Sequence, residues 1–203
     1  MKKILIILLA LTLVFSLASC KKDDSGNTPA APTVDVAAYK TAIANTSLVG
    51  ASIKVTASND IFPNDPLVAE YDVDFNDDGS ATVSFTYMQY NTITPGTEQG
   101  ITSTYKGSAT ISPDGTVTGS DINASVTAAA SVNFNLDESK MTVSEDHGIL
   151  RASIPAANTA SVLGGAIGAD VVLTLTVANG VVTGATINYV ENGVSYEIVC
   201  TYN

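Results

Sequence analysis

Tryptophan is absent from the 203 residues, histidine occurs once and cysteine twice. A lone histidine, His147, cannot build a zinc site, because such sites need several clustered Cys or His ligands. The Gly-x-Ser-x-Gly turn that carries the nucleophile of α/β-hydrolases is also missing. With neither a metal-binding nor a catalytic signature, we expect no cofactor, no metal and no enzymatic activity.

Basic residues are scarce as well, since 9 Lys and Arg stand against 20 Asp and Glu, a formal charge of −11. Proteins that bind nucleic acid or anionic lipid headgroups need clustered Lys and Arg. We therefore expect no nucleic-acid partner. An acidic surface of this kind favours solubility.

The first residues have the pattern of an export signal. Lys2 and Lys3 precede an apolar run from Ile4 to about Phe15, which is too short for the ~20 residues of a membrane span. The sequence Leu17-Ala18-Ser19-Cys20 then resembles the lipobox of bacterial lipoproteins. This resemblance implies that residues 1–19 are a signal peptide and that Cys20 becomes the lipidated first residue. An ordinary secretory signal with a chance cysteine is the alternative.

Residues 20–33 are polar and contain proline, which predicts a flexible, lipidated tether. The Lys-Asp-Asp at residues 22–24 resembles the surface-export signal of lipoproteins in Bacteroidota-type bacteria. The resemblance implies a bacterial cell-envelope protein held in the membrane by the lipid at Cys20. It favours the outer membrane or cell surface over the periplasmic face of the inner membrane.

Residues 34–203 are expected to form a single β domain. Residues 34–45 have helical spacing of Tyr39, Ala42 and Ile43, with Asp35 as a candidate N-cap. From Leu48 onward, apolar and polar residues alternate with a period of two. Turn residues that end in Gly separate the alternating runs, as at residues 76–79, 113–115, 179–180 and 192–193.

These patterns predict an all-β fold, an antiparallel meander of about ten strands that forms a barrel or a two-sheet sandwich. The expected strands include residues 51–57, 69–75, 81–87, 100–106, 108–112, 116–119, 123–129, 132–136, 140–144, 150–154, 171–177, 181–190 and 194–202. Residues 89–100 are expected to be a long polar loop or an irregular hairpin end, and residues 155–169 a short helix. Residues 51–87 and 152–189 loosely parallel each other, so an internal duplication is an open alternative.

Two polar motifs offer candidate chemistry. Asp74, Asn76 and Asp78 match the opening of a calcium loop, but Phe85 stands where that loop requires a bidentate Glu. We favour a hairpin turn there, with weak calcium binding as the alternative. His147 follows Asp146 in a polar stretch, and we interpret the pair as an exposed turn. Cys200 alternates with Ile198 and Tyr202, which predicts a buried apolar residue over a reactive thiol.

Core packing is the expected role of the aromatic residues on the apolar phase of the strands. If the strands close into a barrel with an unfilled interior, the same residues are candidate ligand-binding residues. The candidates are Tyr71, Phe75, Phe85, Tyr87, Tyr189 and Tyr196. A lipoprotein with a short helix before hairpins with Asp-Gly turns resembles lipocalin-like (calycin) β-barrels. That resemblance implies a small hydrophobic ligand inside the barrel, although Gly50-Ala51-Ser52 replaces the Gly-x-Trp of the family.

The sequence therefore predicts a cell-envelope lipoprotein with a non-catalytic binding or structural role. The partner is left open between an envelope or surface macromolecule and a small hydrophobic ligand. A lipocalin-like binder of a small hydrophobic ligand is the first alternative. A surface hydrolase that uses paired carboxylates is the second, because 20 acidic residues allow many pairs.

Overall fold

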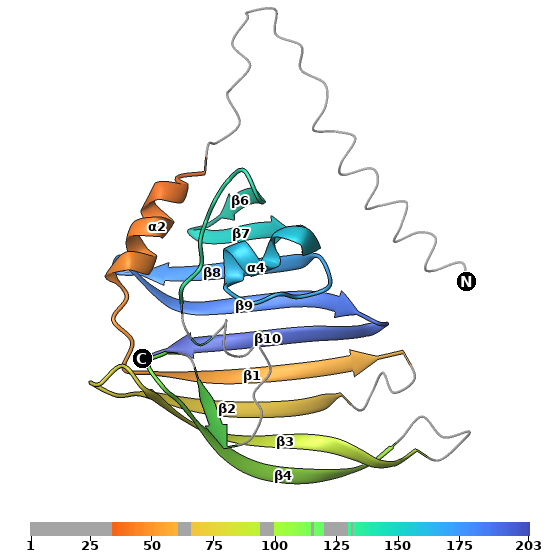
Figure 1. The fold of residues 1–203 in the computed structure, drawn as a ribbon. Coiled ribbons are helices and arrows are strands. Elements are labelled where there is room, and N and C mark those ends of the chain that lie inside the picture. Colours follow the sequence, from red (N-terminus) through yellow and green to blue (C-terminus); the bar gives the residue numbers. More distant parts are fainter. Residues whose placement is uncertain (1–33, 61–65, 94–99, 115, 120–129, 131) are drawn as a thin grey trace, which may run out of the picture. The chain divides into compact units, whose positions relative to one another are not determined.

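In the part of the chain that the structure describes, ten antiparallel strands form one sheet that does not close on itself (Figure 1). The computed structural model describes residues 34–60, 66–93, 100–114, 116–119, 130 and 132–203. The predicted signal peptide, Cys20, the tether and the expected strand at residues 123–129 lie outside this part of the chain. Strand bounds are β1 (Gly50–Asn59), β2 (Leu67–Phe75), β3 (Ala81–Ile93), β4 (Gly100–Ile111), β5 (Val117–Gly119), β6 (Thr142–Asp146), β7 (Ile149–Ile154), β8 (Val171–Ala178), β9 (Val181–Glu191) and β10 (Val194–Tyr202).

The first and last strands are neighbours in the middle of the sheet. The order across the sheet is β5-β4-β3-β2-β1-β10-β9-β8-β7-β6. The chain thus winds outward from β1 to one edge at β5, resumes at the opposite edge with β6 and winds back to β10. The predicted all-β antiparallel fold is confirmed, and the meander is interrupted only between β5 and β6.

Tight turns with positive φ connect the second half of the sheet. His147 and Gly148, Asn179 and Gly180, and Asn192 and Gly193 all have φ between 50° and 78°. Two such residues in a row make the hairpin turn whose twist matches that of the flanking strands. Asn and Gly tolerate this conformation, which explains why the turns at residues 179–180 and 192–193 could be predicted.

The two faces of the sheet differ in polarity. The strand register aligns Leu173, Ile187, Ile198, Val55 and Ala69 in one row across five strands. Leu173, Ile187 and Ile198 are each 0% exposed, and they lie on the inner face with the rest of the core. The outer face carries charged and hydroxyl side chains at the alternating positions, among them Ser52, Glu70, Ser84 and Glu197.

Two short helices and an extended segment cover the inner face on the side of β6 to β9 (Figure 1). They are α2 (Val36–Asn45), α4 (Thr159–Leu163) with the 3-10 turn η1 (Ala156–Asn158) before it, and residues 132–141. The hydroxyl of Thr46, which follows α2, accepts a hydrogen bond of 2.9 Å from the backbone N–H of Val182 on β9. In the described part of the chain, neither helix is long and apolar enough to cross a membrane.

Most predicted elements agree with the structure, apart from two regions. Residues 132–136 are not a strand, although Val132, Phe134 and Leu136 alternate with exposed residues. Val132 has a φ of 51°, and the backbone N–H of Asn135 bonds the carbonyl of Val162 at 2.8 Å. The segment therefore makes tight turns, packs on the core next to α4 and pairs with none of the described strands. In residues 89–100 the irregular hairpin end agrees better than the long loop, because β3 reaches Ile93 and its pairing with β4 shifts register between Tyr90 and Thr92.

The predicted repeat places the hairpins β2–β3 and β8–β9 in equivalent positions. In the first hairpin Ala69 pairs with Tyr87, and in the second Val171 pairs with Tyr189. The duplication itself stays a prediction.

Adjacent residues on β10 test the assignment of the faces. Ile198→Ala should lower the free energy of unfolding by about 2–5 kcal/mol, because it removes buried methylenes and leaves a cavity. Val199→Ala is the control, since Val199 points to the other face and is 38% exposed. The control should cost less than about 1 kcal/mol in urea denaturation. Equal losses for the two variants would contradict this register.

Candidate functional site

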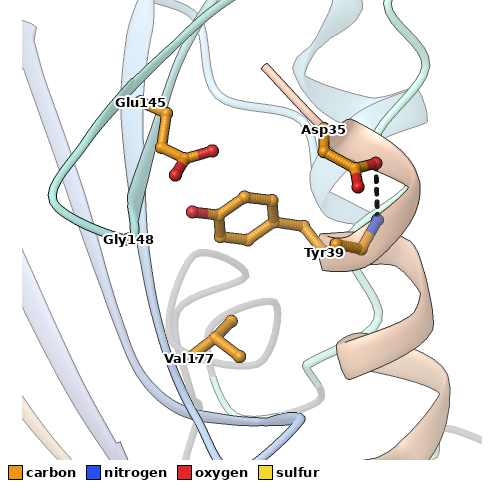
Figure 2. A pocket seen from close by; sticks show the side chains of 6 residues that line it. Asp35, Tyr39, Glu145, Gly148 and Val177 are labelled. Carbon is orange, nitrogen blue, oxygen red and sulfur yellow. Dashed lines mark hydrogen bonds between the residues drawn. The ribbon is translucent and has the colours of Figure 1, made fainter. Parts of the chain in front are cut away.

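A pocket of about 290 Å³ lies between the start of α2 and the hairpin β6–β7 (Figure 2). Its lining combines two carboxylates and a phenol with apolar groups. The lining residues are Asp35, Ala38, Tyr39, Glu145, Gly148 and Val177. These residues come from three regions that are distant in sequence, so the pocket exists only in the folded sheet.

Tyr39 anchors the pocket in the core. Its side chain is 6% exposed, and Figure 2 shows its hydroxyl directed toward the Glu145 carboxylate. Burial raises the pKa of Tyr39, and the negative charge of Glu145 and the hydrogen bond with it raise that pKa further. The phenol therefore stays protonated in the folded protein and donates a hydrogen bond to the Glu145 carboxylate.

Glu145 occupies the inward phase of an edge strand. It pairs with Leu150, which is 0% exposed, while Val143 pairs with buried Ala152 on the same face. A carboxylate at such a position is costly unless it is hydrogen-bonded or reaches water. Both conditions hold for Glu145. Tyr39 donates a hydrogen bond to its carboxylate, and β6 lies at the edge of the sheet, where the carboxylate reaches water.

Asp35 supplies the second carboxylate by capping α2. Its side chain accepts a hydrogen bond of 3.2 Å from the backbone N–H of Ala38. This capping satisfies one of the N–H groups that a helix leaves unpaired at its start. Only one of the carboxylate oxygens is used in this way, so the pocket offers more hydrogen-bond acceptors than donors. Such a pocket suits a cationic or donor-rich group.

The candidate aromatic residues form two separate groups on the inner face. Ring centroids are 5.4 Å apart for Tyr71 and Phe85, 6.2 Å for Phe85 and Tyr87, and 5.4 Å for Tyr87 and Tyr105. The second group is the stacked pair Tyr189 and Tyr196, with centroids 4.8 Å apart.

Strand β1 separates the two aromatic groups in the sheet. Ala57 on β1 and Leu67 on β2 lie next to Tyr196 in the same row of the sheet. Phe75 lies toward the opposite end of β2 from these residues and packs against the core. Tyr189 and Tyr196 border a broader groove of about 700 Å³, together with Asp170 and Asn188.

The three calcium candidates lie at the hairpin between β2 and β3, where Asp78 serves the turn. The backbone N–H and the hydroxyl of Ser80 donate to one oxygen of Asp78, at 2.9 and 2.6 Å. Asn76 donates to the Ser80 hydroxyl at 3.0 Å, and Asp74 belongs to β2. These hydrogen bonds lower the pKa of Asp78. Among the described residues, no three His, Cys, Asp or Glu side chains converge as metal ligands would.

The structure also places the lone histidine and the second cysteine. His147 lies in the turn between β6 and β7, with its side chain 93% exposed, and its ring Nδ1 contacts the Asp146 carboxylate. Cys200 is 2% exposed on the inner face, and burial raises its pKa to about 12. A thiol with that pKa is almost entirely protonated near neutral pH, and the thiolate is the reactive form.

Comparison of the chain with protein-family models gives no match, and comparison with curated protein sequences gives none either.

Sequence reasoning missed the pocket at Tyr39. A signal was present, because Met141, Val143 and Glu145 share one phase of an alternating run whose other members are buried or half-buried. A charged residue among the apolar positions of a strand indicates an edge strand, a hydrogen-bonding partner for the charge or a functional site. The sequence indicated Tyr39 only as one apolar position of a predicted helix, and nothing in it pointed to a contact with Glu145.

A double-mutant cycle tests the contact between Tyr39 and Glu145. Tyr39→Phe and Glu145→Ala should each destabilise the protein, and their coupling free energy should be about 0.5–1.5 kcal/mol, as for one hydrogen bond. Chemical denaturation of the wild type, both single variants and the double variant gives this value. Additive losses would show that the two side chains do not interact.

The same hydroxyl should contribute to alkaline unfolding. A pKa raised in the folded state gives stability that is complete below the ordinary tyrosine pKa of about 10 and is lost as the pH rises through the folded value. Tyr39→Phe should therefore lose less stability than the wild type between pH 9 and 12. An unchanged pH profile would contradict the raised pKa of Tyr39.

Thiol labelling tests the state of Cys200. In a Cys20→Ala background, an aromatic disulfide reagent at pH 8 should react with the folded protein at least about a hundredfold more slowly than with the urea-unfolded protein. The unfolded sample is the control for reagent quality. Fast labelling of the folded protein would instead indicate an accessible thiol.

Proposed function

We propose that this protein is a cell-envelope lipoprotein, anchored through lipid on Cys20, whose β domain has a non-catalytic binding or structural role. The observation that carries the proposal is the apolar run that ends in Leu17-Ala18-Ser19-Cys20. A diacylated cysteine carries two chains, and two anchoring signals give stable residence in a membrane where a single chain does not.

The composition of the remaining chain supports this assignment. Without Lys2 and Lys3, 7 basic and 20 acidic residues remain, a formal charge of −13. Such a chain lacks a cationic patch to hold it on anionic lipid, so the proposed anchor has to be hydrophobic. Residues 21–33 extend at most ~3.5 Å each, which allows the domain to stand roughly 45 Å from the anchor.

Three of the acidic side chains have a structural role in turns. Asp78, Asp114 and Asp137 each have a lowered pKa, and in each case the leading cause is a hydrogen bond within the residue's own turn. These carboxylates lie in three different turns and hold the backbone there. Catalytic carboxylate pairs instead lie close together and have pKa values driven apart by their surroundings.

Substitution of the two cysteines tests the anchor. Cys20→Ala should move the protein from the membrane fraction to the soluble fraction and abolish incorporation of an alkyne fatty acid supplied to the cells. Cys200→Ala is the matched control and should change neither. Membrane retention and labelling of Cys20→Ala at wild-type levels would refute the lipid anchor.

A further inference from the structure

Strand β6 is an edge strand whose outer side has no partner strand in the described part of the chain. It forms a two-residue hairpin with β7, closed by the pair Asp146 and Ile149. The closing pair of such a hairpin exchanges hydrogen bonds, and these pairs alternate along an antiparallel ladder. The backbone N–H and C=O groups of Val143 and Glu145 therefore point away from β7, toward the open side.

Two carboxylates face the pocket beside this edge. Glu145 comes from β6 and Asp35 from the start of α2 (Figure 2), while the adjacent Asp146 lies on the other face of the strand and contacts His147. A second copy of this chain that paired edge to edge would bring like charges together. Inward charges and short edge strands are established means of preventing that kind of pairing. The same charges complement a segment that carries Lys or Arg.

We propose that β6 binds an extended, cationic segment of another protein as an eleventh strand of the sheet. Side chains directly opposite each other in neighbouring strands point to the same face. The residue opposite Glu145 would thus face the mouth of the pocket that Asp35, Tyr39 and Glu145 line. A Lys or Arg there meets two carboxylates, while the groups of Val143 and Glu145 supply main-chain hydrogen bonds.

This inference rests on the proposed binding role, because it names the edge and the chemistry of its partner. It is independent of the lipid anchor. Cys20→Ala tests membrane attachment and leaves β6 intact, so the anchor and the binding edge can fail separately.

Titration with a blocked synthetic peptide tests the edge. The probe is acetyl-Lys-Thr-Lys-Thr-Lys-Thr-amide, which places all its lysines on one face when extended. Added to the full-length, ¹⁵N-labelled protein in neutral detergent micelles, it should shift the amide signals of residues 142–146 and slow hydrogen exchange at Val143 and Glu145. The peptide with Glu in place of Lys should cause no change.

Two variants distinguish strand addition from diffuse attraction. Glu145→Gln should weaken binding about fivefold, as expected for loss of one partly exposed charge pair. Glu197→Gln is the matched control, because it removes the same charge from the outer face of β10 and should bind as the wild type does. Val143→Pro removes an outward N–H without breaking a bond to β7, and should abolish binding.

The proposal is overturned if the peptide shifts signals elsewhere, if Glu145→Gln and Glu197→Gln weaken binding equally, or if no binding occurs at millimolar peptide. Self-association of the protein through β6 would overturn it as well. If thermal melting shows that Val143→Pro unfolds, the comparison of the two Gln variants decides the question alone.

Discussion

The pairing of β1 with β10 is the constraint on which the rest of the sheet depends. Nine residue pairs join the two strands, from Ala51 with Tyr202 to Asn59 with Val194. Every other strand is added outward from this central pair, so both borders of the sheet are formed by mid-chain strands. These borders, β5 and β6, are 3 and 5 residues long. Short borders limit unwanted strand addition, and the long strands are thereby kept inside the sheet.

Local patterns predicted the strands well but could not predict their partners. Residues 181–190 and 194–202 alternate cleanly around Asn192-Gly193, and the hairpin β9–β10 follows from that pattern alone. Alternation reveals which side chains share a face, but any two alternating strands can pair. The pairing of β1 with β10 joins residues that are far apart in the sequence, so no local pattern predicts it. Residues 132–136 show a second limit of sequence patterns. Their side chains alternate between buried and exposed as in a strand, but the structure assigns no strand there.

The candidate site was less predictable than the fold, for a related reason. The calcium motif at Asp74 to Asp78 was a local pattern, and in the structure the Asp78 carboxylate is engaged by its own turn. The pocket instead combines the cap of a helix, a tyrosine on its buried face and a glutamate on a distant strand. No spacing in the sequence encodes that meeting. The only local signal was Glu145, a charged residue among the apolar positions of its strand, whose carboxylate needs a hydrogen-bond donor or water.

One property links the acidic composition to the proposed edge. The proposed lipid anchor would confine the protein to a surface, where copies meet more often than in solution, and a formal charge of −13 after removal of residues 1–19 would oppose their association. An edge that repels its own copies by charge attracts segments of opposite charge by the same field. Protection of β6 against self-pairing and the proposed selectivity for a cationic partner would therefore be two consequences of one arrangement, in which Glu145 points inward and Tyr39 donates a hydrogen bond to it.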